Sequence, residues 1–371
     1  MNRTDAQSPS HKSVKLLSRL VLPPRDGSVA SGLARANLKL EILNLSRAEF
    51  NDLVALADSN HVIVRGLEAL LDLICEENDI TRREWAESAL KAEKARIETA
   101  IQYLGEICNA FEQQSYKVAV IKSLDHWPDL GSDLDLFSDA NAEDVLQVMQ
   151  NVFGAHIAPR SWGDRLARKW NFIVPGLQEA VEIHVGRLGQ TGEQVAIANS
   201  LLDRARWAVV GGHSFRTASA SDRLMISTLQ RMYRHFYFRL CDIVDTAALA
   251  DVGGIDYNNL RSCARNAGIW QGVATYLAII SDYAECYRGS GIDLPQFVLD
   301  AARFRGDDIY YAKSFLRVPI MPQSARLYGS QLAGILGRGE LHNGARLSLL
   351  PWLATAAVVG QKLTGSDKGI W

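Results

Sequence analysis

The sequence predicts a mixed α+β fold, in which a small mixed β-sheet core is flanked by N-terminal helices and a C-terminal helical domain. Three observations indicate this class: helical spacing of apolar residues from about 38 to 111, short strand-like segments between 117 and 185, and helical spacing again beyond 219. We expect four regions, which are a flexible tail over 1–32, a helical region over 33–112, an α/β core over 113–218 and a helical domain over 219–371.

The N-terminal part divides at about residue 32. Residues 1–32 contain Ser, Gly and the Pro23-Pro24 pair, with one short apolar patch over 14–22, which favours a tail. Leu67, Leu70 and Ile74 then recur at helical spacing. A capping-box pattern over 81–84 predicts the start of a long helix that continues to about 107.

The α/β core is predicted from four strand-like runs. Residues 118–121 form an apolar, β-branched run that is typical of a buried strand, and residues 133–137 alternate polar and apolar side chains. Asp139 or Asn141 is suited to cap the helix that follows. Two more strands are expected over 171–174 and 180–185. The segment 222–252 is expected to form one long helix or two, and the segment 270–287 another helix.

Composition excludes several classes of protein. The chain has 40 Lys+Arg and 42 Asp+Glu, a net charge of −2, which argues against a dedicated nucleic-acid binder. Its five cysteines contain no CxxC pair, which favours reduced core cysteines over a disulfide or zinc framework. The polar N-terminus is unlike a secretory signal, and the apolar run over 347–360 is 14 residues long, short of the roughly 20 that span a bilayer. We expect a cytoplasmic protein in which this run is a buried helix rather than an interfacial anchor.

Three carboxylates indicate a metal site. Asp133 and Asp135 are two residues apart on one predicted strand, so both side chains leave the same face. Glu182 lies between apolar residues on a later strand, and if the two strands are neighbours the three acids converge. Such oxygen ligands suit Mg²⁺ or Mn²⁺, here two ions. A solvated strand edge is the alternative for an isolated Asp-x-Asp.

The residues upstream of this pair carry a family resemblance. Lys122-Ser123 ends the first strand, Gly131-Ser132 directly precedes Asp133, and Glu182 begins a Glu-Ile-His sequence. This order resembles the DNA polymerase β-like nucleotidyltransferase superfamily, and within it a poorly characterised bacterial nucleotidyltransferase-like family. A later helical segment adds the spaced residues His235, Arg239, Asp242 and Asp245. The chain departs from the pattern where the superfamily usually has Gly, at Lys122, and where its closer relatives do, at Ser123.

The resemblance implies a metal-dependent transfer of a nucleoside monophosphate from an NTP, expected to be ATP, to an acceptor hydroxyl or phosphate. Asp133, Asp135 and Glu182 would hold the two metal ions and act in catalysis. His184 and Asp242 would contact these ligands and orient them, and for His184 a satisfied surface histidine is the alternative. The residues expected to bind the nucleotide are Lys122, Ser123, Gly131, Ser132, Arg168, Lys169, His235 and Arg239.

The basic residues also allow structural roles. Arg168 and Lys169 fit a phosphate-binding segment or the solvated face of a helix. Arg231, His235 and Arg239 are spaced i, i+4, i+8, which predicts one helical face that contacts either the nucleotide or a buried network of ion pairs.

Neutral overall charge makes a small-molecule or protein acceptor the expectation, rather than a long nucleic acid. Two other functions fit the same residues: a catalytically silent binding protein that keeps the fold, and a phosphotransferase that transfers the γ-phosphate.

Overall fold

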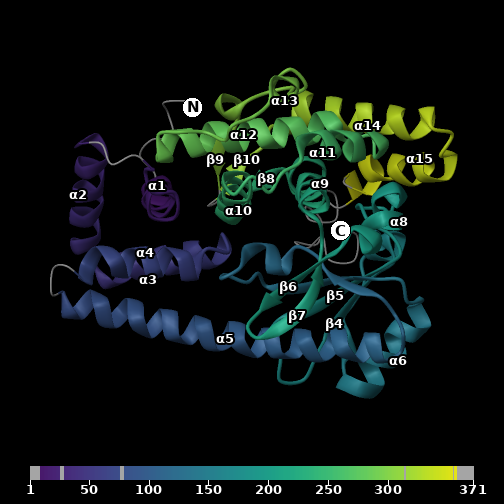
Figure 1. The fold of residues 1–371 in the computed structure, drawn as a ribbon, viewed down its shortest axis with the longest axis horizontal. Coiled ribbons are helices and arrows are strands. Elements are labelled where there is room, and N and C mark those ends of the chain that lie inside the picture. Colours follow the sequence, from purple (N-terminus) through teal and green to yellow (C-terminus); the bar gives the residue numbers. More distant parts are fainter. Residues whose placement is uncertain (1–8, 26–28, 76–78, 313–314, 354, 357–371) are drawn as a thin grey trace.

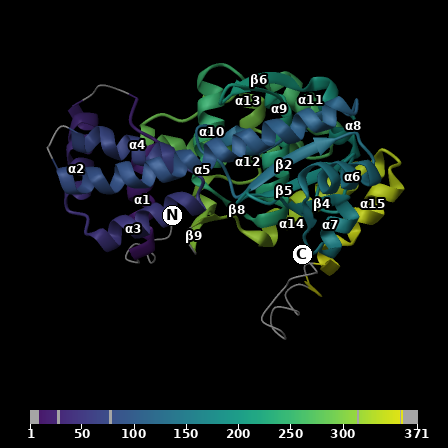
Figure 2. The ribbon, with the colours of Figure 1, turned by 90° about the horizontal axis from the view of Figure 1, so that it is seen from below.

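The computed structural model describes residues 9–25, 29–75, 79–312, 315–353 and 355–356 (Figure 1). Over this part the chain has the predicted α+β class, with a seven-stranded sheet and helices at both ends of the sequence. The long helix α5 (Ile80–Gln113) runs along one side of the sheet, and the C-terminal helices lie on the other side (Figure 1). Figure 2, a view from below, shows α5 in front of the sheet and the N-terminal helices gathered at one end.

The N-terminal helices form a bundle at that end of the molecule. Their bounds are α1 (Pro9–Val21), α2 (Val29–Leu43), α3 (Arg47–Ser59) and α4 (Ile63–Ile74). The predicted flexible tail is therefore wrong over 9–21, because Leu17 and Leu20 of α1 are buried against the other helices. The Ser18 hydroxyl also lies 2.7 Å from the Tyr283 hydroxyl of the C-terminal region. The short apolar patch over 14–22 therefore provides the buried face of this helix.

The N-cap of helix α5 is Asp79, two residues before the first residue of the predicted capping box. The Asp79 carboxylate accepts a hydrogen bond from the Arg82 backbone N–H at 3.0 Å and caps the helix, so the expected box over 81–84 is not the cap. Ile101 and Leu104 on its buried face belong to the core beneath the sheet. The helix thereby supports the strands that position the acidic residues.

The sheet combines parallel and antiparallel pairs, in the order β3-β4-β5-β2-β1-β7-β6. Its strands are β1 (Val118–Val120), β2 (Asp133–Ser138), β3 (His156–Ile157), β4 (Lys169–Ile173), β5 (Ala180–Val185), β6 (Arg206–Val210) and β7 (His213–Thr217). The helices between them are α6 (Ala142–Phe153), α7 (Trp162–Ala167) and α8 (Val195–Arg204), with a 3-10 turn, η3 (Ser123–His126), after β1. The four predicted strands are present, and Asn141 caps α6 by accepting hydrogen bonds from two backbone N–H groups.

The C-terminal region is mainly helical, as predicted, and the segment 222–252 forms two helices, one of the two expected arrangements. Helix α9 (Ala220–Gln230) passes into a π-helical turn, η4 (Arg231–His235), and a short strand, β8 (Tyr237–Phe238), before α10 (Leu240–Asp251). The remaining elements are α11 (Tyr257–Asn266), α12 (Trp270–Arg288), α13 (Gln296–Leu299), η5 (Gly306–Asp308), β9 (Tyr310–Ala312), β10 (Phe315–Arg317), η6 (Ile320–Ser324), α14 (Ala325–Gly337) and α15 (Leu341–Ser348). Strands β8, β10 and β9 form a second, three-stranded sheet.

One apolar core joins the N-terminal helices, the sheet and the C-terminal helices. A small second cluster lies under α14 and α15, where Leu347 and Leu350 are buried while Trp352 is exposed. The predicted helix over 347–360 lies partly outside the described residues. All five cysteines are free, and two of them, Cys108 and Cys241, are buried. Within the described ranges we find no helix with both the length and the apolar character needed to cross a membrane.

Candidate functional site

The three predicted acids come from two neighbouring parallel strands, β2 and β5. In the register of this pair, Asp135 lies directly opposite Glu182. Leu134 and Leu136 are fully buried in the core, so the alternation of β2 places Asp133 and Asp135 on its other face. The condition under which the acids converge is met, because the two strands are neighbours, and all three acids line one cavity.

The turn after β1 holds an unusual backbone conformation. Lys122 has φ 63° and ψ −59°, and the Ser123 N–H donates to the Ile121 carbonyl at 2.7 Å, so the turn is a tight γ-turn with the strained sign of φ. The Ser123 hydroxyl accepts a hydrogen bond from the Asp135 N–H at 2.7 Å and donates to the Asp133 carbonyl at 3.1 Å. Ser123 therefore ties this turn to β2.

The turn directs Lys122 toward the carboxylates. Its ammonium contacts the carboxylate of Asp135 and lies 3.3 Å from Glu182 Oε1. A second ammonium, on Lys169 of β4, lies 2.7 Å from Glu182 Oε2 and 3.1 Å from Asp164 Oδ1. Both lysines are thus held by buried carboxylates at the centre of the site.

The pKa values of Glu182 and Asp135, which face each other, are shifted in opposite directions. Burial opposes ionisation of Glu182, but Lys122 and Lys169 outweigh it and hold the Glu182 pKa well below its usual value. Burial, with the adjacent charge of Glu182, raises the pKa of Asp135 well above its usual value. Burial lowers the pKa of His184 to about 4, so this ring is neutral near pH 7, and its Nε2 lies 2.9 Å from Glu182 Oε1.

The donor set suits a hard divalent cation, but a lysine lies among the donors. Ligand atoms of Asp135, Glu182 and His184 lie within 4.8 Å of one another, and carboxylate oxygens are what Mg²⁺ and Mn²⁺ prefer. The Lys122 ammonium contacts both carboxylates of this group. The residues fit a divalent ion at this position only if Lys122 moves aside. The carboxylate of Asp133 lines the same cavity and has no ion-pair partner within 4.0 Å among the described residues.

A cavity of about 190 Å³ brings together most of the predicted site. The predicted residues in its wall are Lys122, Ser123, Gly131, Ser132, Asp133, Asp135, Lys169, Glu182, His235 and Arg239. The cavity therefore joins the sheet edge to the C-terminal helical region, as a phosphate-binding cleft between two parts of a fold requires.

The wall facing the acids is cationic. Arg231 is 2% exposed and its Nε lies 2.7 Å from Asp242 Oδ2. Arg234 and Arg239 also line the cavity, and their buried Nε atoms have no hydrogen-bond partner among the described residues. Burial and the nearby charge of Arg234 lower the pKa of His235 well below its usual value. Guanidinium groups at a cavity wall are suited to bind phosphate oxygens.

The predicted helical face of Arg231, His235 and Arg239 does not exist. Arg231 and His235 belong to the π-helical turn, Phe236 has a positive φ of 54°, and Arg239 is the N-cap of α10. The helix is interrupted because β8 pairs with β10, a strand about 80 residues later. All three side chains nevertheless line the cavity, and the alternative of a buried ion pair is present between Arg231 and Asp242.

Three predicted residues lie outside the cavity wall. Arg168 is exposed at the left-handed C-cap of α7, and the helix ends before Lys169, so the two do not share a helical face. His184 lies behind Glu182, where it was expected to support a ligand. Asp242 pairs with Arg231 and caps α10 rather than contacting the acids.

Sequence reasoning missed further residues in the wall, which are His61, His126, Gln230, Arg234 and Tyr237, whereas Arg231 was expected to face either the nucleotide or a network of ion pairs. His126 lies in the spacer between Ser123 and Asp133, so its position in the motif was a usable signal. Arg234 lies in the same basic segment as Arg231, but it falls outside the i, i+4, i+8 spacing that was considered. His61 comes from the loop between α3 and α4, and no sequence pattern connects it to the acids. No family model matches the chain, and no curated protein matches it significantly.

Proposed function

We propose that the cavity binds a nucleoside triphosphate with a divalent cation and transfers the nucleoside monophosphate to an acceptor. One observation carries this proposal: the acids of β2 and β5 face the arginines of η4 and α10 across a single cavity. Carboxylates that hold a cation and arginines that hold phosphate oxygens are the two components that a metal–triphosphate complex needs.

The roles follow from the contacts. Asp133 and Asp135 would hold Mg²⁺, which when bound neutralises phosphate charge and lowers the pKa of an acceptor hydroxyl. Arg234 and Arg239 line the cavity and would bind phosphate oxygens through their guanidinium groups. Glu182 stays ionised and is fixed by Lys169, so it orients the acceptor hydroxyl and accepts its hydrogen bond.

Lys122 moves from Asp135 to the phosphates when the cation binds. This displacement would keep positive charge beside the carboxylates in both states, because a divalent ion would take the place of the singly charged ammonium. The side chain is long enough to serve two partners, since lysine is a point charge on a flexible stem.

A second function, binding without catalysis, is favoured by the same lysine. An ammonium between Asp135 and Glu182 neutralises the facing carboxylates permanently if it does not move. The arginines would then hold a phosphorylated ligand without a metal ion.

The two functions are separated by calorimetric binding of ATP, GTP, CTP and UTP, with Mg²⁺ and with a chelator. For the proposed transferase, affinity for at least one nucleotide depends on Mg²⁺ in the wild type, and Asp135→Asn removes that dependence. Arg234→Gln weakens binding at least tenfold, since a hydrogen bond to a charged group contributes about 1.5–3 kcal/mol. The exposed Arg206 of β6 provides the control Arg206→Gln, which leaves affinity unchanged.

Equal affinity with and without Mg²⁺ in both the wild type and Asp135→Asn would rule out the metal site and favour binding alone. Catalysis is then tested with acceptor panels, by pyrophosphate release and by the mass of the product. A nucleoside monophosphate on the acceptor supports the proposal, and a single phosphate on the acceptor indicates γ-phosphoryl transfer instead.

A further inference from the structure

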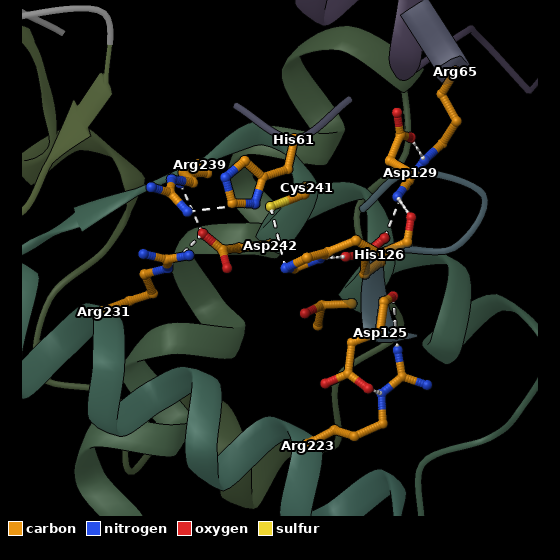
Figure 3. A network of polar contacts seen from close by, with 12 residues as sticks. His61, Arg65, Asp125, His126, Asp129, Arg223, Arg231, Arg239, Cys241 and Asp242 are labelled. Carbon is orange, nitrogen blue, oxygen red and sulfur yellow. Dashed lines mark hydrogen bonds and ion pairs between the residues drawn. The ribbon is translucent and has the colours of Figure 1, made fainter. Parts of the chain in front are cut away.

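A second group of side chains that could hold a metal ion lies beside the same cavity, apart from the acids. His61, His126 and Cys241 each offer one ligand atom, and these atoms lie within 4.8 Å of one another. His61 comes from the α3–α4 loop, His126 ends the turn η3, and Cys241 lies in the first turn of α10. Figure 3 shows the three side chains directed toward a common point.

The spacing of sulfur and nitrogen is close to that of a tetrahedral metal site. Cys241 Sγ lies 3.9 Å from His126 Nε2. Zinc bonds of about 2.3 Å to sulfur and about 2.0 Å to nitrogen at a tetrahedral angle place the two ligand atoms about 3.5 Å apart. A shift of about 0.4 Å therefore suffices to bring this pair into bonding positions.

The ring of His126 is held in the orientation that such a site needs. Its Nδ1 lies 2.6 Å from Asp245 Oδ2, which leaves Nε2 facing Cys241. Asp245 is itself fixed by Arg65, whose NH1 lies 2.8 Å from Oδ1. A carboxylate behind a histidine is the usual arrangement around metal-binding imidazoles, because it fixes the ring and raises its basicity.

The loop that carries His61 is tied to the helix that carries Cys241. The Cys241 N–H donates to the Asn60 carbonyl at 3.2 Å, and the Leu240 N–H donates to the Asn60 side chain at 3.1 Å. His61 has a positive φ of 53°, which these contacts maintain. Arg239 donates to His61 Nδ1 at 3.3 Å, a long contact that coordination through either ring nitrogen would break.

The Cys241 thiol is the group that could balance the charge of a cation bound here. Among the described residues, the surrounding network contains four arginines and three aspartates that Figure 3 labels, which are Arg65, Arg223, Arg231, Arg239, Asp125, Asp129 and Asp242. A fourth aspartate, Asp245, pairs with Arg65. Their charges cancel, so a cation is balanced chiefly by the Cys241 thiolate. Cys241 is fully buried and does not line the cavity, which argues against a nucleophile that must reach a substrate and favours an internal ligand.

We propose that His61, His126 and Cys241 bind one zinc-class divalent ion, with the fourth position open to the cavity. One thiolate and two imidazoles suit zinc and neighbouring transition metals rather than Mg²⁺. Both imidazoles line the cavity wall, so the open position faces the same space as the acids. The site shares no ligand with Asp133, Asp135 and Glu182, so it stands or falls independently of the proposed function.

The test uses the full chain, freed of metal with a chelator and titrated with Zn²⁺ and, as a spectroscopic probe, Co²⁺. We expect one zinc ion per chain and a thiolate-to-cobalt charge-transfer band. Cys241→Ser removes the band and weakens zinc binding at least a hundredfold, while Cys241→His restores zinc binding without the band. The controls Cys108→Ser, another buried cysteine, and Asp135→Asn keep both signals.

Because Cys241 is buried, its variants are first checked by circular dichroism, and His61→Ala provides a ligand variant at the cavity wall. The proposal is overturned if any folded Cys241→Ser or His61→Ala protein binds zinc as the wild type does. It is also overturned if the wild type binds no zinc, or if Asp135→Asn alone abolishes binding.

Discussion

The position of Lys122 between two carboxylates leads to a prediction about stability and metal binding. Lys122→Met keeps most of the side-chain stem but removes the ammonium from Asp135 and Glu182. Breaking a buried ion pair from one side costs about 3–5 kcal/mol, because a buried charge is left without compensation. Lys169 still contacts Glu182 at 2.7 Å, so we expect a loss at the lower end, about 3 kcal/mol.

A comparison with Lys122→Gly separates the backbone from the charge. Both variants lack the ammonium, but only glycine accepts φ 63° without a steric cost. A left-handed backbone costs other residues about 1–2 kcal/mol. Lys122→Gly is therefore expected to be more stable than Lys122→Met by about 1 kcal/mol, after the greater entropy that glycine loses on folding is allowed for.

Mg²⁺ should then stabilise the two variants more than the wild type. A cation at one hundred times its dissociation constant adds about 2.7 kcal/mol to the free energy of unfolding, and in the variants it no longer competes with the ammonium. Urea unfolding with and without Mg²⁺, followed by tryptophan fluorescence, measures all of these differences. Lys117→Met is the control, since this lysine is 53% exposed and its nearest carboxylate lies 3.8 Å away.

Equal stabilisation of wild type and Lys122→Met by Mg²⁺ would refute the competition between the ammonium and the cation. A Lys122→Gly protein less stable than Lys122→Met would refute the assignment of strain to the turn.

Four further predictions concern the rest of the fold. Leu17→Ala should lower the free energy of unfolding by about 2–5 kcal/mol in urea titrations, because α1 is packed rather than free. Asp242→Asn leaves the Arg231 guanidinium without its buried partner and should cost about 3–5 kcal/mol by the same measurement. Burial raises the pKa of Glu193 above its ordinary 4.5, so the wild type loses stability as pH rises and this carboxyl group ionises. The free energy of unfolding of Glu193→Gln should therefore increase relative to that of the wild type between acid and neutral pH. Burial raises the pKa of Cys108 to about 12, so mass spectrometry should find this thiol unmodified by iodoacetamide until the protein unfolds.

The acidic half of the site could be predicted because strand alternation leaves little freedom. With Leu134 and Leu136 in the core, Asp133 and Asp135 have only one face available. The sequence alone does not determine which strand lies beside β2, because a strand's neighbour depends on the whole topology. The structure shows that β2 pairs with β5.

The cationic half could not be predicted in detail because tertiary contacts override local spacing there. The i, i+4, i+8 pattern of Arg231, His235 and Arg239 has helical spacing, yet pairing of β8 with the distant β10 breaks the helix. The contact of Lys122 with Asp135 depends on a γ-turn that no propensity favours for lysine. His61 and Cys241 are 180 residues apart in sequence and meet only through the fold.

If the proposed function holds, the ion pairs of the cavity imply that a cation and a triphosphate would assist each other in binding. A cation alone must displace the Lys122 ammonium from Asp135 and leave that ammonium without a partner. A triphosphate alone finds Arg234 and Arg239 available but also meets the acids of the opposite wall. When both are present, the cation would take the place of the ammonium and the phosphates would bind the displaced ammonium. The triphosphate would then give Lys122 a new partner, and the cation would offset the repulsion between the phosphates and the acids. Because linkage is reciprocal, the factor by which Mg²⁺ raises nucleotide affinity must equal the factor by which the nucleotide raises Mg²⁺ affinity, and Lys122→Met should reduce both factors together.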